Sequence, residues 1–343
     1  MNTQFQINDP SIESQWRAII LFGKNSATYK FAFAKALLEL IDRQKNKISL
    51  EELSIPFANS IVEHLKKTDK QGNATSSKFL DGCRNFIKGE ITQDNLYHLT
   101  EKYGFVNVID AFQNVNGGPI PKLFYEKDFA LGKNEIVITD NLLEIKEKFQ
   151  FRNLEQEVEA RWSLVETAWN LKINPKLLEV KYDENKSFFF IEESVKMKRI
   201  DITSVRDALN GYQKGRCFYS NSEISIVKND VNLCAVDHFL PHVNKLAHLN
   251  TGVNINGVWN LVLADSKVNA HKSARIPELR YLKRLFKRNE FYIESKHPLA
   301  ETIINQTGYS KEIRWKFLEA QYQIAVNNSI PPWKPETEYK DIF

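Results

Sequence analysis

Cysteine and long apolar runs are both scarce in this sequence, and their scarcity excludes several classes of protein. The 343 residues include three cysteines, Cys83, Cys217 and Cys234, which make no disulfide framework of the kind found in small secreted domains. No stretch approaches the ~18 uninterrupted apolar residues of a membrane-spanning helix, and the first residues lack the basic and apolar regions of an export signal. We therefore expect a cytoplasmic protein without a membrane partner.

A large excess of one charge is also missing. The 47 basic and 43 acidic residues give a formal net charge of +4, which a solvated surface explains without any partner. Basic residues nevertheless outnumber acidic ones between residues 267 and 296. If these basic side chains form a ridge on the surface, the ridge suits sequence-independent contact with the phosphates of a nucleic-acid backbone. The alternative is that they only form a solvated surface. The candidates for nucleic-acid contact are Lys267, His271, Arg275, Arg280, Lys283, Arg284 and Lys287.

The length allows about two domains, and 42% hydrophobic residues are enough for real cores. Apolar spacing and turn residues predict an α+β chain whose N-terminal part is mainly helical. We expect four segments: a helical domain with a recognition or regulatory role (1–150), a connecting helix and β-hairpin (151–204), a ββα domain (205–290), and a C-terminal helix and tail (291–343).

Single elements can be placed within these segments. Apolar residues at helical spacing predict helices over 12–22, 26–42, 154–171 and 202–213. Strands are expected over 136–139 and, as a hairpin, over 178–182 and 187–191. The polar stretch 66–78 is expected to be a loop. A second, weaker set of candidates for nucleic-acid contact lies in the N-terminal domain: Lys24, Lys30 and Lys35.

The richest chemistry lies between residues 235 and 273. Asp237 and His238 are adjacent, Asn260 follows in an apolar run, and Asn269 and Lys272 are spaced Asn-x-x-Lys. Phosphodiester hydrolysis needs a nucleophilic water and positive charge at the phosphoryl and leaving oxygens. A carboxylate and an amide oxygen suit Mg²⁺ or Mn²⁺, and an imidazole with an ordinary pKa of about 6.5 can accept a proton from water. These residue types together indicate cleavage of phosphodiester bonds.

The local pattern suits this chemistry. The runs 233–239 and 259–264 are short and apolar, as expected of two strands joined by a polar loop over 242–257. Adjacent side chains of a strand point to opposite faces, so Asp237 and His238 should diverge. Asp265 or Ser266 can cap a helix on which Asn269 and Lys272 share a face, where both would address one phosphate.

A second helix is predicted after Pro277, which is suited to a first helical turn. Leu279, Leu282 and either Leu285 or Phe286 should form its buried stripe, because they recur at helical spacing. The basic side chains Arg280, Lys283, Arg284 and Lys287 then remain outside, where they form the ridge expected to contact phosphates.

These residues resemble the HNH endonucleases, in the variant whose last histidine is replaced by asparagine, as in the nuclease domain of RNA-guided CRISPR effectors. The resemblance covers roughly residues 205–290, from the lead-in Tyr212-Gln-Lys-Gly-Arg-Cys-Phe-Tyr to Ile276-Pro277. It implies that Asp237 and Asn269 are metal ligands and that His238 is the general base. It also implies that Asn260 fixes the loop between the strands and that Lys272 touches phosphate. His242 is a candidate for a third ligand, although His242 and His248 are also ordinary loop residues.

The sequence departs from many members of that family in one respect. Those members hold the unit together with two Cys-x-x-Cys pairs around zinc, whereas here Ser220 follows three residues after Cys217 and the second pair is missing. We therefore expect no structural zinc. In its place we expect a small apolar core of Phe218, Leu233, Val236, Trp259 and Leu261.

The expected function is that of a Mg²⁺-dependent DNA endonuclease. By analogy with the family, its setting is bacterial defence against foreign DNA, as a restriction enzyme or antiphage effector with partner proteins of a defence system. An RNA-cleaving toxin with the same centre is an alternative, because the mechanism needs no 2′-hydroxyl. A non-cleaving nucleic-acid-binding module is a further alternative, against which the presence of Asp237, His238 and Asn269 argues. The sequence sets no oligomeric state.

Overall fold

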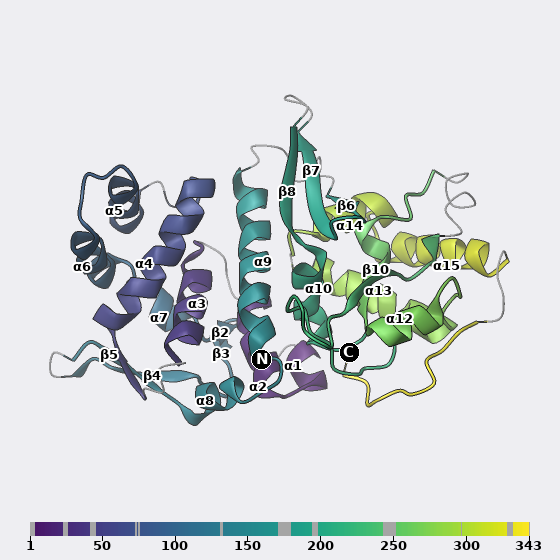
Figure 1. Ribbon diagram of the computed structural model, residues 1–343, viewed down its shortest axis with the longest axis horizontal. Coiled ribbons are helices and arrows are strands. Elements are labelled where there is room, and N and C mark those ends of the chain that lie inside the picture. The colour runs from purple at the N-terminus through teal and green to yellow at the C-terminus, as the bar shows by residue number, and fades with distance from the viewer. Residues whose placement is uncertain are drawn as a thin grey trace. The chain divides into compact units, whose positions relative to one another are not determined.

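The computed structural model describes residues 4–22, 27–41, 46–72, 74, 76–130, 133–170, 180–193, 198–242, 252–295, 297–327 and 332–342. They form helices and small antiparallel sheets, so the predicted α+β class is confirmed (Figure 1). The chain divides into two compact units, Met1–Asn170 and Leu171–Phe343, and the boundary lies inside the segment 151–204 expected to be a connector. Among the described helices, none is both long and apolar enough to span a membrane.

The first unit is mainly helical. Its central helix α3 (Tyr29–Ile41) buries almost all of its side chains, among them Phe31, Phe33 and Leu37. The helix α4 (Leu50–Lys67) begins at a capping box, in which Ser49 and Glu52 satisfy each other's backbone N–H groups. The other helices are α1 (Gln4–Asn8), α2 (Ile12–Phe22), α5 (Lys78–Ile87), α6 (Gln93–Tyr103), α7 (Val108–Ala111), α8 (Asp140–Lys146) and α9 (Phe151–Asn170).

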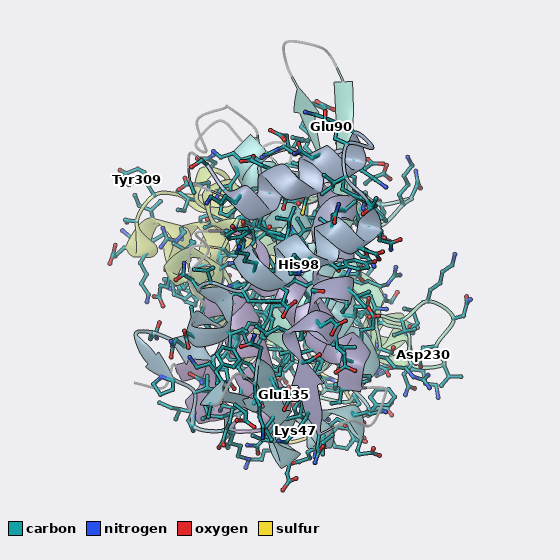
Figure 2. All side chains as sticks on the ribbon, turned by 90° about the vertical axis from the view of Figure 1, so that its left-hand side faces the viewer. Lys47, Glu90, His98, Glu135, Asp230 and Tyr309 are labelled. Atoms are coloured by element: carbon teal, nitrogen blue, oxygen red, sulfur yellow. The ribbon has the colours of Figure 1, made fainter. Side chains whose placement is uncertain are left out.

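Two small antiparallel sheets complete the first unit. One has the order β1-β5-β4, with strands Lys47–Ser49, Glu135–Ile138 and Tyr125–Asp128. At its edge the Lys47 ammonium lies 3.3 Å from an Asp128 oxygen and 3.8 Å from a Glu135 oxygen. Lys47 and Glu135 are labelled in Figure 2. The other is a hairpin of β2 (Asn114–Val115) and β3 (Gly118–Pro119), whose turn residues Asn116 and Gly117 have φ of 52° and 84°. Such left-handed turns match the twist of paired strands.

The helix predicted over 12–22 and the strand predicted over 136–139 are confirmed to within one residue. The helix predicted over 26–42 is observed from Tyr29 to Ile41, and its expected cap Ser26 lies outside the described residues, as does Lys24. Lys30 is buried and Lys35 pairs with Glu159, so neither side chain is arranged as a free phosphate contact.

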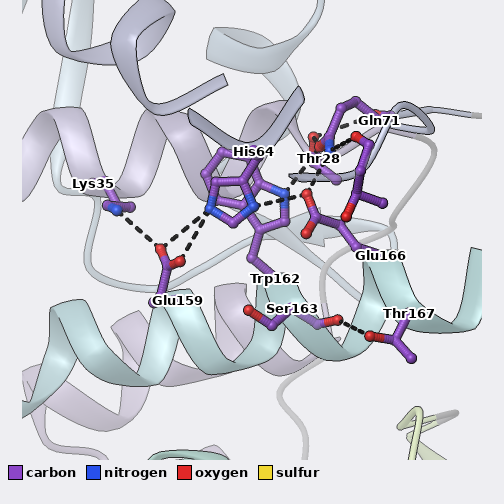
Figure 3. Close-up of polar contacts among 10 residues, drawn as sticks. Thr28, Lys35, His64, Gln71, Glu159, Trp162, Ser163, Glu166 and Thr167 are labelled. Carbon is purple, nitrogen blue, oxygen red and sulfur yellow. Dashed lines mark hydrogen bonds and ion pairs between the residues drawn. The ribbon is translucent and has the colours of Figure 1, made fainter. Parts of the chain in front are cut away.

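A buried polar cluster joins α4 to α9 (Figure 3). The His64 ring stacks on Trp162 with ring centroids 3.5 Å apart, Nδ1 lies 2.7 Å from Glu166, and Nε2 lies 3.1 Å from Glu159. Burial alone lowers the pKa of His64, but hydrogen bonds and charges of the two glutamates outweigh it and raise that pKa. Burial raises the pKa of Glu159, but His64 and Lys35 lower it to about 2.

The second unit begins with a three-stranded antiparallel sheet of order β6-β7-β8 (Lys181–Asp183, Phe188–Glu193 and Lys198–Ser204). The expected hairpin is therefore present, and a third strand extends it. The helix predicted over 202–213 begins only at Val205 as α10 (Val205–Gln213), because residues up to Ser204 pair with β7. Sheet pairing decided this boundary, whereas the sequence offered only the helical spacing of apolar residues.

The remainder of the second unit is a ββα arrangement followed by helices. The strands β9 (Ala235–His238) and β10 (Leu261–Ala264) are antiparallel, and a 3₁₀ turn (Val258–Asn260) precedes β10. The helices are α12 (Ser266–Lys272), α13 (Leu279–Glu294), α14 (Ala300–Thr307) and α15 (Lys311–Asn327). One helix was expected in the C-terminal segment 291–343, whereas the described residues of that segment contain two, α14 and α15, in addition to the end of α13.

Two details of this part differ from expectation. Pro277 does not lie in the first turn of α13; its backbone pairs with Trp333, and the helix begins at Leu279. The Leu279 side chain is 47% exposed, whereas Leu282 and Leu285 are buried as expected. In the core of the ββα arrangement Phe218, Trp259 and Leu261 are buried, but Leu233 and Val236 are only half-buried. The cysteines Cys217 and Cys234 are also buried, and neither forms a disulfide.

Candidate active site

The ββα arrangement is assembled by local signals in the sequence. In the strand register Asp237 lies opposite Val262 and His238 opposite Leu261. The Asp265 carboxylate caps α12 by accepting hydrogen bonds from the backbone N–H of Lys267 and Val268, at 2.8 and 3.1 Å. Of the two caps that the sequence allowed, Asp265 is therefore the one used.

Asn260 joins the two strands to the loop between them. Its side-chain oxygen accepts from the Leu240 N–H at 2.8 Å, and its amide nitrogen donates to the carbonyl oxygens of Leu240 and Ile255, both at 3.0 Å. The side chain is completely buried, and each of these bonds satisfies a backbone group that would otherwise be costly to bury. Asn260 thus positions the end of β9, where His238 lies, and the geometry agrees with its expected role.

Asp237 is a buried carboxylate held on both oxygens. The Tyr219 hydroxyl donates to Oδ2 at 2.6 Å, and the Lys272 ammonium lies 3.1 Å from Oδ1 and 3.0 Å from Oδ2. Burial raises the pKa of Asp237 above its ordinary value, and Lys272 and Tyr219 oppose that rise. The backbone N–H of His238 also contributes a hydrogen bond to this carboxylate, so a further ligand would have to displace one of these contacts.

Lys272 was expected to touch phosphate, and the structure places it elsewhere. Its side chain is completely buried, and its ammonium also donates to the His238 carbonyl oxygen at 2.9 Å. A buried ammonium needs a counter-charge and hydrogen-bond acceptors, and Asp237 with the end of β9 supplies both. Lys272 therefore orients Asp237 and fixes the backbone of His238.

His238 points away from Asp237, as the alternation of a strand predicts. Its Nε2 lies 3.0 Å from the Asn256 carboxamide oxygen, and its ring lies 5.3 Å from that of His242 and 5.9 Å from that of Tyr182. Burial, then the nearby His242, lowers the pKa of His238 to about 4. The imidazole is therefore neutral near pH 7. Because an oxygen acceptor faces Nε2, that nitrogen carries the proton, and Nδ1 retains the lone pair that can accept one.

The expected metal ligands Asp237 and Asn269 contribute only two oxygen-bearing side chains, on β9 and α12. Asn269 lies on α12 one turn before Lys272 and is half-buried. Within the described residues no group of three or more His, Cys, Asp and Glu side chains is arranged to hold a metal ion. One carboxylate oxygen of Asp237 and the amide oxygen of Asn269 suit a hard ion that takes its remaining ligands from water and phosphate. His242 packs near His238, and His248 lies outside the described residues.

The expected basic ridge is divided by the structure. Arg280 pairs with Glu278 and Glu338, and Arg284 pairs with Asp341 while donating to the Phe218 carbonyl. The Arg284 side chain is only 12% exposed, so the expectation that it remains outside is wrong. Arg288, which lies in the same basic stretch, is fully buried and donates to the carbonyls of Leu261 and Trp259.

The other candidates for nucleic-acid contact differ in exposure. The side chains of Lys267, Lys283 and Lys287 are exposed. Arg275 donates to the carbonyl oxygens of His271 and Lys272, which closes the end of α12. His271 accepts from the Trp333 indole at 3.4 Å and lies 3.7 Å from Glu336. The three exposed lysines are thus the members of the expected ridge that remain best placed for phosphate.

No protein-family model, curated protein or solved structure matches this chain. The functional argument therefore depends on the arrangement of the residues themselves.

Three contributors to the site were missed at the level of sequence. Tyr219, which donates to Asp237, lies 18 residues before it. Asn256, the partner of His238, lies in the polar loop. The carboxylates of the C-terminal segment lie about 58 residues beyond the arginines that they neutralise. Tyr219 had one usable signal, since it ends the lead-in motif. The other contacts are long-range and follow no periodicity in the sequence.

Proposed function

We propose that the second unit is a metal-dependent endonuclease of the HNH type that hydrolyses phosphodiester bonds in DNA. The observation that carries the proposal is His238, a neutral imidazole whose Nε2 is tied to Asn256 while Nδ1 is left as the basic atom. It stands next to a buried carboxylate in a ββα arrangement whose loop is anchored by Asn260.

In this proposal each residue has a distinct part. Nδ1 of His238 accepts a proton from the attacking water, a contribution worth roughly 10²–10⁴ in rate. Asn256 holds the required tautomer, and Asn260 holds the strand end that carries the ring. Asp237 and Asn269 would hold Mg²⁺ or Mn²⁺, which when bound supplies positive charge at the phosphoryl and leaving oxygens. Lys272 and Tyr219 fix the direction of the Asp237 carboxylate.

The products of such a reaction carry 5′-phosphate and 3′-hydroxyl ends, since water attacks phosphorus and the 3′ oxygen departs. The exposed lysines Lys267, Lys283 and Lys287 support contact with backbone phosphates. The biological setting proposed from the family resemblance is defence against foreign DNA.

The test is digestion of supercoiled plasmid by the full chain with Mg²⁺, with EDTA as the metal-free control and a matched RNA substrate in parallel. We expect DNA nicking that His238→Ala reduces by at least a hundredfold without loss of DNA binding, because the imidazole acts in the chemical step alone. His98→Ala is the matched control, since His98 is exposed on α6 of the first unit (Figure 2). Unchanged nicking by His238→Ala removes this residue from the mechanism.

A further inference from the structure

The first unit contains a cavity of about 990 Å³ that the proposed chemistry does not use. Its wall is formed by the beginnings of α3 and α5, the end of α6, helix α7 and the β2–β3 hairpin, all labelled in Figure 1. Cavities that take small organic ligands measure roughly 300–1,000 Å³. The volume is therefore sufficient for a ligand of several rings or a nucleotide.

Aromatic side chains make up much of the wall. Tyr29, Phe79, Tyr103 and Phe112 all line the cavity, and the rings of Tyr29 and Phe79 meet edge to face with centroids 5.4 Å apart. Phe79 and Phe112 are buried, whereas Tyr29 and Tyr103 are half-buried. Half-buried rings of this kind stack on planar ligands without selecting a particular one.

The polar part of the wall is positive and rich in amides. Lys78 lies at the start of α5 with its ammonium 5.3 Å from the Tyr103 ring, and no described residue forms an ion pair with it. Asn107, Asn114 and Asn116 add exposed carboxamides. None of the described residues that line the cavity is an aspartate or a glutamate.

The second lysine of the wall has a different task. The Lys30 ammonium is buried and donates to the carbonyl oxygens of Ile19 and Ile20 near the end of α2, at 3.2 and 3.1 Å. It is therefore committed to the fold. Among the described residues that line the cavity, the charge available to a ligand comes from Lys78, which suits one anionic group beside an aromatic ring.

We propose that this cavity binds a nucleoside monophosphate, with the base against Tyr29 and Tyr103 and the phosphate against Lys78. Every base has a π-face for the tyrosines and a hydrogen-bonding edge for the asparagine amides. A single phosphate matches a single lysine, and the absence of carboxylates in the described wall removes the repulsion that an anion would otherwise meet. This proposal does not depend on the nuclease activity proposed for the second unit.

The experiment is isothermal titration of the full chain with AMP, GMP, CMP and UMP, and with the matching nucleosides. At least one monophosphate is expected to bind with one-to-one stoichiometry. Lys78→Gln should lower the affinity for that monophosphate about tenfold or more, because the lost contact is charge-assisted. The affinity for the matching nucleoside should not change. Tyr103→Ala should lower the affinity for both the monophosphate and the nucleoside about fivefold or more, because it removes a ring on which the base stacks.

Two control variants lie on the same helices but outside the cavity. Lys88→Gln removes a lysine at the end of α5, and Tyr97→Ala removes a tyrosine of α6, and both should bind like the parent. Lys78 is exposed, so its variant tests the site even if Tyr103→Ala fails to fold. The proposal is overturned if no monophosphate binds at millimolar concentration. It is equally overturned if inorganic phosphate binds as well as the nucleotides, or if Lys78→Gln and Lys88→Gln behave alike.

Discussion

The ion pair of Lys272 with Asp237 is the residue-scale feature on which the candidate site depends. Both side chains are buried, at 0 and 10% exposure, and the pair is completed by Tyr219 and by the His238 carbonyl. Pairing in such a place is required by the cost of an isolated buried charge. The same ammonium keeps Asp237 in one orientation.

Replacement of Lys272 by methionine should destabilise the second unit strongly. The change leaves the Asp237 charge buried without its partner, and breaking a buried pair in this way costs about 3–5 kcal/mol. Urea unfolding of the full chain measures the loss. Lys267→Met on the exposed side of the same helix is the control, expected to lie within about 0.5 kcal/mol of the parent. Equal stability of the two variants would show that the pair contributes nothing.

His238 should titrate far below an ordinary histidine. Burial, then the proximity of His242, lowers its pKa to about 4, so the folded protein binds this proton only in acid, well below neutral pH. NMR titration of the histidine ring signals, with His238→Ala to assign the resonance, gives the midpoint directly. An observed midpoint near the ordinary value of about 6.5 would contradict the burial described for this ring.

At the scale of elements, the segment 332–342 lies against the helix α13 through its charges. Glu338 pairs with Arg280, and Asp341 pairs with Arg284 at 2.9 Å. Trp333 fixes the start of this segment, because its backbone accepts from the N–H of Glu278 at 2.9 Å and its ring packs on Tyr219. Two arginines expected to contact phosphate are therefore neutralised by carboxylates of the same chain.

Neutralising those carboxylates should strengthen DNA binding. In the double variant Glu338→Gln, Asp341→Asn, Arg280 keeps only Glu278 and Arg284 keeps the Phe218 carbonyl, so each guanidinium loses a carboxylate that competes with phosphate. Each added phosphate contact changes the slope of log K against log salt by about −0.9. Fluorescence anisotropy with duplex DNA at several salt concentrations measures the affinity and slope. The control, Glu301→Gln with Glu319→Gln, changes net charge equally on α14 and α15. Identical results for the two double variants would attribute the gain to net charge alone.

The contact between α4 and α9 makes the first unit sensitive to pH. His64 has a raised pKa when folded, so its contribution to stability is complete below the unfolded value of about 6.5 and is lost as the pH rises through the folded value. Glu159, lowered to about 2, contributes above its unfolded value of about 4.5 and loses that contribution as the pH falls toward 2. The cluster therefore stabilises most between about pH 4.5 and 6.5.

This dependence can be measured by urea unfolding from pH 5 to pH 9. The free energy of unfolding should fall above about pH 6.5, by at most about 1.4 kcal/mol per pH unit for one proton. His64→Gln should remove that fall, whereas His98→Gln, on an exposed face of α6, should keep it. A fall that persists in His64→Gln would have to come from other groups.

For the molecule as a whole, the sequence predicted what local signals control. The two strands around residues 237 and 262, the Asp265 cap and the anchoring role of Asn260 all agree with the structure, since periodicity and capping act over a few residues. The nuclease assignment itself remains a proposal.

What the sequence could not predict were contacts between segments far apart in the chain. Lys272 was placed on a phosphate because nothing local shows that its helix face is buried against Asp237. Pro277 fits a first helical turn by preference, yet pairing with Trp333, 56 residues away, holds it in extended backbone. The end of strand β8 was taken as helix because Ile202, Val205 and Leu209 recur at helical spacing, and nothing local shows that residues up to Ser204 pair with β7.

The stack of His64 on Trp162 gives the first unit an optical property. A protonated imidazole accepts an electron from an excited indole far more readily than a neutral one, and here the two rings are parallel to within 4°. Among the six tryptophans of the chain, the fluorescence of Trp162 should therefore be quenched in mild acid and should recover once the proton leaves His64. The fluorescence of the unlabelled protein thus reports the charge at the centre of its α4–α9 contact.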